Sequence, residues 1–266
     1  MTDARRAAIA DRGAASGFTT FREGSLHAAL KARYAATIAG AQVEAAVDGF
    51  IVDVAGQREL VEIQTANFGS ARRKLERLVA SRRVVLVYPI TVEKRLVRVD
   101  ADGAVLYRRR SPRRGVAFDL FDELVHIPAL VAHPNFRIEL ALTCEEEIRG
   151  PIPEGARYRY PRDWRRLDRR LLDIVETRRI DTPVDLLGLL PLGLPEPFTT
   201  ADIVAATKRS KRLARRAVYC LERSGAIARL PRRGRLVAYQ TRSSASEPAS
   251  LSVARPEGVG RAVQNP

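Results

Sequence analysis

Two apolar segments of strand length are interrupted by acidic and amide side chains. Asp53 lies within the run 50–54, and Glu62 and Gln64 lie within the run 59–65. Acidic and amide side chains are depleted in strands, so their presence here asks for an explanation. Because residues i and i+2 of a strand project from the same face, Glu62 and Gln64 point together, while Val61 and Ile63 point to the opposite, apolar side. The pattern predicts two consecutive strands with one polar face.

A short connection would join these two strands into a hairpin. With a two-residue turn at 56–57, or a four-residue loop over 55–58, Asp53 pairs opposite Leu60 and lies diagonal to Glu62 on the same face. Two carboxylates and the neighbouring amide oxygen then converge on one side of the hairpin.

The flanking segments complete an α/β pattern. A helix is expected over 25–38, where apolar side chains recur at four-residue steps, and a second over 70–79, with apolar spacing of three and four. The run 83–90 is almost continuously apolar, which is typical of a strand buried on both faces. The remaining elements expected are a hairpin over 96–107, an amphipathic helix over 118–125, a strand over 135–142, and a Pro- and Gly-rich linker at 150–160.

The polar face of the hairpin suits a hard divalent cation. Mg²⁺ takes oxygen ligands, keeps several waters and usually binds through one or two protein carboxylates, here Asp53 and Glu62. A bound Mg²⁺ or Mn²⁺ would polarise a phosphoryl oxygen and lower the pKa of a water, which is the chemistry of phosphodiester hydrolysis. Gln64 would position that water or ligate weakly.

An Asp on one strand followed by Glu-x-Gln on the next resembles the catalytic hairpin of the PD-(D/E)XK nuclease superfamily, in which the second strand carries Glu-x-Lys. The order helix, three strands, helix, strand over 25–90 is also the order expected of that nuclease core. The resemblance implies a restriction-endonuclease-like mixed sheet flanked by helices, forming a nuclease domain over 21–149. Gln64 departs from the family's lysine, as it does in some restriction endonucleases of the superfamily.

Two further site residues follow from the resemblance alone. Lys74 is expected to replace the missing lysine, because in the superfamily this lysine sometimes lies on the helix that follows. Glu23, near the start of the helix 25–38, matches an acidic residue that often joins the metal site. Such nucleases often act as dimers, so the resemblance also implies a homodimer.

The same residues have a simpler interpretation. Asp53 could end a strand at a turn, while Glu62 and Gln64 face solvent on the open side of an antiparallel hairpin. The helix macrodipole favours acidic residues near helix starts, which accounts for Glu23, and Lys74 lies among arginines on a basic helix. On this interpretation the chain is a non-catalytic DNA-binding regulator with a degenerate nuclease-like fold.

Residues 161–242 have a different character and are expected to form a second, small α+β domain. A helix is expected over 164–175. Beyond it, a capped helix at 201–207, a turn, a helix at 211–223 ended by Gly225, and a basic hairpin resemble a winged helix-turn-helix. The basic start of the second of these helices is the part that a recognition helix presents to the major groove. The expected DNA contacts are Lys208, Ser210, Lys211, Arg212, Arg215 and Arg216 and, in the wing, Arg232, Arg233 and Arg235.

The charge of the chain favours a polyanionic partner. The 266 residues carry a formal net charge of +15 with a sequence pI of 10.7, which indicates nucleic acid. The arginine-dense segment 108–115 is expected to bind backbone phosphate. RNA stays an alternative to DNA, because a basic surface does not distinguish them, and winged helices also mediate protein contacts.

Other classes of protein are disfavoured. No apolar stretch approaches the ~20 residues of a spanning helix and no signal-peptide pattern is visible, so no membrane partner and a cytoplasmic location are expected. Cys144 and Cys220 are far apart, which argues against a disulfide framework or a zinc site. Segments 1–20 and 243–266 are expected to be disordered. The sequence therefore predicts a metal-dependent DNA endonuclease or phosphodiesterase that a winged-helix domain delivers to DNA, with the regulator as the alternative.

Overall fold

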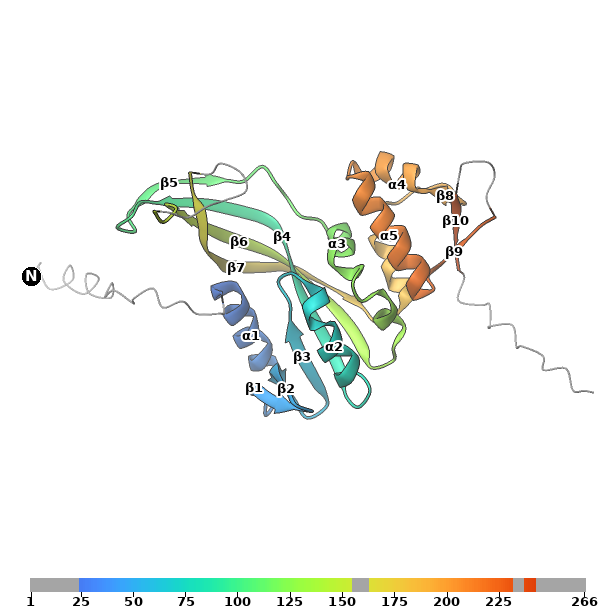
Figure 1. Cartoon of the computed structure of the whole chain (residues 1–266), viewed down its shortest axis with the longest axis horizontal. Helices are drawn as coiled ribbons and strands as arrows, with labels where there is room; N and C mark the ends of the chain where they lie inside the picture. The colour runs from blue at the N-terminus through green and yellow to red at the C-terminus, as the bar shows by residue number, and fades with distance from the viewer. Residues whose placement is uncertain (1–23, 155–162, 232–236, 243–266) are drawn as a thin grey trace, which may run out of the picture.

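One mixed β-sheet organises the molecule, for which a computed structural model describes residues 24–154, 163–231 and 237–242 (Figure 1). Its strands are β1 (Gln42–Val47), β2 (Phe50–Ala55), β3 (Glu59–Ile63), β4 (Arg83–Val99), β5 (Val105–Arg110), β6 (Phe136–Gly150) and β7 (Arg165–Ile180). Their order is β1-β2-β3-β4-β6-β7, and β5 pairs with the far half of β4. β4 runs parallel to β3 and β6, whereas the other neighbours are antiparallel.

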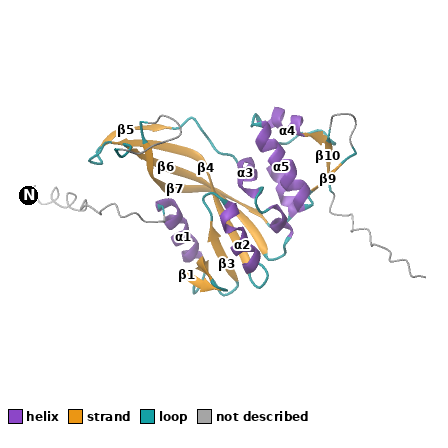
Figure 2. Cartoon of the chain, in the orientation of Figure 1, coloured by secondary structure: helices purple, strands orange, loops and turns teal. Residues whose placement is uncertain are grey.

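Helices cover both faces of this sheet (Figure 2). α1 (Ser25–Thr37) packs its buried Leu26 and Leu30 on one face, in the cluster that includes Val85 and Val87 of β4. The opposite face carries Val84 and other alternate residues of β4, and it is covered by the remaining helices. These are α2 (Phe68–Leu78), η1 (Ala117–Leu120), α3 (Phe121–Leu124), η2 (Pro128–Ala132) and η3 (Pro183–Leu189). No described helix is long and apolar enough to cross a membrane.

These observations confirm the α/β class, with a mixed sheet flanked by helices. The predicted helix over 25–38 and the predicted strand at 83–90 are present. β4 continues well beyond the predicted strand and forms the predicted hairpin with β5. The predicted helix over 118–125 is present as a 3-10 turn, η1, that leads directly into the short α-helix α3.

The register of the β2–β3 hairpin differs from the predicted one. Ala55 pairs with Leu60 and Val54 with Val61, so the predicted pairing of Asp53 opposite Leu60 is wrong by two residues. Because side chains alternate with a period of two, a shift of two keeps a residue on its face of the sheet. Continuing the observed register brings Asp53 level with Glu62.

The predicted helix over 164–175 is wrong, because this segment lies in β7. β7 pairs antiparallel with β6 from Gly150–Arg165 to Ile138–Ile180. The apolar side chains between 164 and 175 have helical spacing, but partners on the neighbouring strand decide the conformation: Arg169 of β7 forms an ion pair with the fully buried Glu145 of β6. Long-range pairing overrides local spacing here. The sheet thus extends past the predicted linker at 150–160, into the predicted second domain.

A smaller unit follows the sheet. It contains α4 (Thr200–Thr207), α5 (Lys211–Ser224) and a three-stranded sheet in the order β8 (Phe198–Thr199), β10 (Ala238–Thr241), β9 (Ile227–Arg229). The predicted start and stop signals are confirmed: Thr199 caps α4 in a capping box with Asp202, and Gly225 ends α5 with a φ of 89°. α5 packs on α3 and η2, so one apolar cluster runs from the main sheet into the smaller unit.

We expect Phe121→Ala to destabilise both units together. Phe121 is fully buried in the shared cluster and meets Phe118 edge to face, with ring centroids 5.2 Å apart. Truncation of a buried Phe costs about 3–5 kcal/mol in the free energy of unfolding. Urea unfolding followed by circular dichroism measures this loss. The control Leu192→Ala, at a fully exposed position, should change stability little, and an equally small loss in Phe121→Ala would show that the two units do not share a core.

Candidate active site

Asp53 lies at a break in the strand pairing. The β1–β2 ladder is regular on both sides of it, but opposite Asp53 the backbone of Glu44 is left-handed, with a φ of 54°. This conformation is strained for a residue with a side chain. The β2–β3 ladder stops at Val54, and the backbone N–H of Ile63 donates to Asp53 Oδ2 at 2.8 Å. The carboxylate takes the place of a ladder carbonyl, and the strand itself therefore fixes its position.

His27 of α1 reaches the same point from the other side. Its Nε2 lies 3.3 Å from Asp53 Oδ2 and 3.1 Å from the carbonyl oxygen of Ile63. Burial raises the pKa of Asp53, but the hydrogen bonds from His27 and Ile63 and the charges of His27 and Lys74 outweigh it, and the pKa lies below its usual range. Asp53 is therefore ionised at neutral pH.

Glu62 is the buried carboxylate of the site. Its Oε1 accepts from Lys74 Nζ at 2.5 Å and from Gln64 Nε2 at 3.4 Å, whereas its buried Oε2 has no hydrogen-bond partner among the described residues. Lys74 also donates to the carbonyl oxygen of Ile51 at 2.5 Å, which ties α2 to β2. Burial and the nearby charge of Asp53 raise the pKa of Glu62, although Lys74 opposes them. An added cation would relieve both causes of this rise.

A cavity of about 310 Å³ opens beside Asp53. At its edge, Lys31 of α1 donates to Glu44 Oε1 at 2.7 Å. The cavity gives small molecules access to one side of the carboxylate. Its lining consists of Gly24, His27, Lys31, Glu44, Ile51, Asp53 and Thr65.

Asp53 and Glu62 are the residues that could hold a hard cation here. Within the described ranges, no group of three or more His, Cys, Asp or Glu side chains is arranged to hold a metal. Asp53 and Glu62 nevertheless supply the one or two carboxylates that Mg²⁺ usually takes from a protein. Among the described residues, Glu62 Oε2 has no hydrogen-bond partner, so this oxygen is available as a metal ligand.

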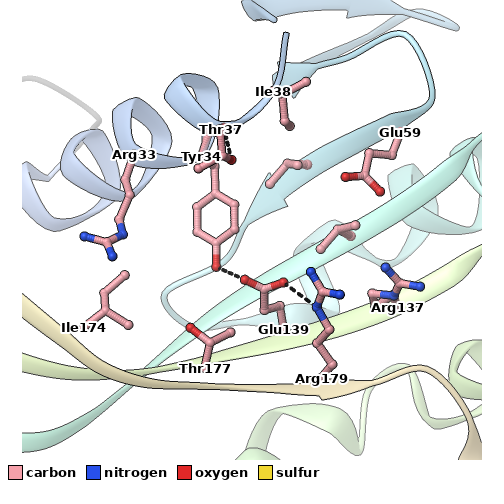
Figure 3. A pocket seen from close by; sticks show the side chains of 12 residues that line it. Arg33, Tyr34, Thr37, Ile38, Glu59, Arg137, Glu139, Ile174, Thr177 and Arg179 are labelled. Atoms are coloured by element: carbon pink, nitrogen blue, oxygen red, sulfur yellow. Dashed lines mark hydrogen bonds and ion pairs between the residues drawn. The ribbon is translucent and has the colours of Figure 1, made fainter.

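A second polar cluster fixes α1 on the sheet (Figure 3). Tyr34 of α1 donates its hydroxyl hydrogen to Glu139 of β6, and Arg179 of β7 lies 3.5 Å from the same carboxylate, beside a cavity of about 250 Å³. Burial, reinforced by Glu139, raises the pKa of Tyr34 far above its usual range, so the hydroxyl keeps its proton. Because α1 also carries His27, this cluster helps to hold the imidazole against Asp53.

Most of the predicted site residues come together. Asp53, Glu62, Gln64 and Lys74 form one contact network, while Glu23 lies outside the described residues. No role was predicted for His27, Lys31 or Glu44. The i, i+4 spacing of His27 and Lys31 on α1 places both on one face and was the available signal. No sequence signal marks the left-handed Glu44.

The predicted DNA contacts divide into three groups. Lys211, Arg212 and Arg215 are exposed on α5, and Lys208 and Ser210 form the turn before it, where Ser210 caps the helix through Leu213. Arg216 differs, because it donates to the backbone and the side chain of Asp122 at 2.7 and 2.8 Å, and it holds α5 against α3. Arg216 thus has a partner within the protein, and Arg212 also lies 3.6 Å from the Asp122 carboxylate. The role of both residues as DNA contacts stays a prediction. The wing residues Arg232, Arg233 and Arg235 lie outside the described residues.

Comparison with known proteins places the α/β sheet in a family. The chain belongs to the family described as a domain of unknown function (DUF8091), whose model matches residues 24–181, from α1 to the end of β7. A Treponema pallidum (strain Nichols) protein, described as an uncharacterized protein, is 28% identical over 245 residues, which cover 91% of this chain and 95% of that protein. No solved structure matches. The family region contains every described residue of the candidate site.

We expect Asp53→Asn to remove an acid-sensitive contribution to stability. Because the pKa of Asp53 is lowered by folding, the contribution is present above the usual pKa of an Asp, about 3.9, and is lost as the pH falls through the lower folded value. The variant should therefore be less stable than wild type at pH 5, with the difference shrinking toward pH 2. Urea unfolding across this range measures it, with Asp48→Asn in the exposed β1–β2 turn as an isosteric control. A difference that stays constant down to pH 2 would contradict the assignment.

Proposed function

We propose that this protein is a metal-dependent DNA endonuclease or related phosphodiesterase of the PD-(D/E)XK type, with Mg²⁺ or Mn²⁺ as its metal. The smaller unit is then a winged helix that delivers the catalytic sheet to DNA. Family membership is neutral on this point, since the family's function is unknown.

The contact between Lys74 and Glu62 carries the proposal. The sequence Glu-x-Gln lacks the lysine of the superfamily pattern. Whether another cation replaces that lysine depends on which side chains lie near Glu62 in the fold. Lys74 Nζ lies 2.5 Å from Glu62 Oε1, although twelve residues and a helix boundary separate the two. A cation, two carboxylates and an amide thus meet at a strained point of the sheet, and one of them, Asp53, lines a cavity. Strain of this kind clusters at functional sites.

Each residue has a distinct task in this proposal. Asp53 and Glu62 would hold the metal, which when bound supplies an activated water and a polarised phosphoryl oxygen. Lys74 would stabilise the negative charge that develops on the phosphate, and Gln64 would orient water. His27 would hold the Asp53 carboxylate in place, and Glu23 keeps its predicted role as an outer ligand.

One observation favours the second candidate, a non-catalytic DNA-binding regulator. The carboxylates are largely satisfied by the protein itself: Asp53 Oδ2 accepts from Ile63 and faces His27, and Glu62 Oε1 accepts from Lys74. Such internal pairing is also what a decayed site would keep for stability. A cleavage assay separates the two candidates, and RNA substrates test the alternative polymer.

We expect Mg²⁺- or Mn²⁺-dependent cleavage of plasmid DNA that stops in EDTA. Glu62→Ala and Asp53→Ala should abolish it, because each removes a metal ligand. Lys74→Ala should lower it about 10²- to 10³-fold, as expected for the loss of one group that stabilises transition-state charge. Gel analysis of plasmid relaxation and linearisation measures each rate.

The matched control is Glu76→Ala, which removes an exposed carboxylate from the same helix, α2, where it pairs with Arg72. It should cleave like wild type. Cleavage that survives Glu62→Ala would refute the site, and wild-type protein without any metal-dependent cleavage would favour the regulator.

We expect the double variant Lys211→Ala/Arg215→Ala to bind duplex DNA more weakly without loss of stability. Both side chains are exposed on α5, and removing two phosphate contacts should reduce the slope of log affinity against log salt by about 1.8. Fluorescence anisotropy at several salt concentrations measures this slope. Arg216→Ala should instead lower the melting temperature, because it breaks the contact with Asp122. A slope unchanged in the double variant would exclude α5 as the DNA-binding helix.

A further inference from the structure

One end of the main sheet extends beyond the helices (Figure 2). This extension, called the arm below, consists of β5 and the adjoining ends of β4, β6 and β7, at 93–99, 144–150 and 165–170. All six residues of β5 are exposed, and among the described strands β5 pairs only with β4, so its other edge has no strand partner there. Its exposed side chains are Val105, Leu106, Tyr107, Arg108, Arg109 and Arg110.

A strongly basic groove of about 600 Å³ lies on the arm. It is lined by five cations and one carboxylate, Glu147, which accepts from Lys94 at 2.9 Å and from Arg149 at 2.6 Å. The other three cations of the groove have no carboxylate partner within the described residues. They are Arg113, Arg165 and Arg166. The groove therefore presents an excess of positive charge that the protein does not neutralise.

The tryptophan of the chain stands in this groove. Trp164 is the single Trp of the sequence, it is partly exposed, and the guanidinium of Arg149 lies 3.7 Å from the centre of its ring. This cation–π contact places a cation on one face of an indole that solvent can reach. Proteins that bind single-stranded nucleic acids combine these two elements, because bases stack on aromatic rings while cations follow the backbone.

We infer that the arm groove binds a single strand of nucleic acid, with a base stacked on Trp164 and phosphates paired with Arg113, Arg165 and Arg166. A duplex fits less well, because its bases are already stacked on one another. This inference rests on the proposed function and specifies its substrate. The substrate would carry an unpaired strand beside its duplex. The smaller unit lies at the other end of the molecule (Figure 1) and would bind the duplex part of the substrate.

An acidic protein segment is the main rival occupant. It would satisfy the same three arginines but would not stack on the indole, and it would not distinguish a normal oligonucleotide from one without bases. Competition between polyglutamate and oligothymidine, described below, distinguishes the two occupants.

Trp164 makes the groove directly observable, because all tryptophan emission of the protein comes from it. The probe is a short oligothymidine added to the Glu62→Ala protein in EDTA, so that no cleavage occurs. We expect quenching of the emission that saturates with added strand and weakens with salt. An abasic phosphodiester of the same length should bind roughly 5- to 150-fold more weakly, the range expected for loss of one base–aromatic stack.

Variants separate the groove from the rest of the surface. Arg165→Ala/Arg166→Ala should weaken the quenching titration, whereas Arg178→Ala, an exposed position at the other end of β7, and Lys211→Ala/Arg215→Ala should not. Trp164→Phe keeps an aromatic ring and should keep most of the affinity for labelled oligothymidine by anisotropy, and Trp164→Ala should lose it. Circular dichroism of each variant checks folding.

Absence of quenching, or equal affinity for the abasic strand, would overturn the inference. Competition by polyglutamate as strong as that by oligothymidine would assign the groove to an acidic protein segment instead. These readouts are independent of catalysis: saturable quenching without any metal-dependent cleavage would refute the proposed function alone, and cleavage without quenching would refute the arm groove alone.

Discussion

The buried carboxylate of Glu62 is the constraint on which the site depends. A carboxylate in a low-dielectric position is costly unless it is paired, and here Lys74 of α2 satisfies one oxygen while the other has no partner among the described residues. Because Lys74 also donates to the backbone of β2, the ion pair fixes α2, β2 and β3 relative to one another. The Lys74–Glu62 pair thus orders the fold but leaves the second Glu62 oxygen without a partner among the described residues. A cation bound near Asp53 would pair with that oxygen.

The rest of the architecture places groups around this point. The break in the ladder at Asp53 frees its carboxylate to accept from Ile63, and the Tyr34–Glu139 contact holds α1 so that His27 faces that carboxylate. β4 then links the site to the arm, where positive charge gathers around Trp164, and α5 packs on the helices over the other face of the sheet. The charge of the chain is therefore distributed along one continuous framework rather than confined to the smaller unit.

The sequence predicted what local patterns determine. The apolar stripe of α1, the buried run of β4, and the cap and stop signals of α4 and α5 rest on periodicity and turn chemistry, and the structure confirms them. Partners distant in sequence decided the rest: pairing with β6 makes a strand of a segment that has helical spacing, and Asp122 engages Arg216. In the site, Asp53, Glu62, Gln64 and Lys74 followed from alternation and resemblance, but the left-handed Glu44 and the reach of His27 depend on tertiary contacts that no local pattern encodes.

The central claim is that Asp53 and Glu62 together hold a divalent cation. Titration of Mn²⁺ into the purified protein, followed by electron paramagnetic resonance of the free ion, tests it without DNA or activity. The account predicts a bound ion in wild type that is lost in both Asp53→Ala and Glu62→Ala and kept in Glu76→Ala. Binding that is absent from wild type, or unchanged when either carboxylate is removed, would contradict it.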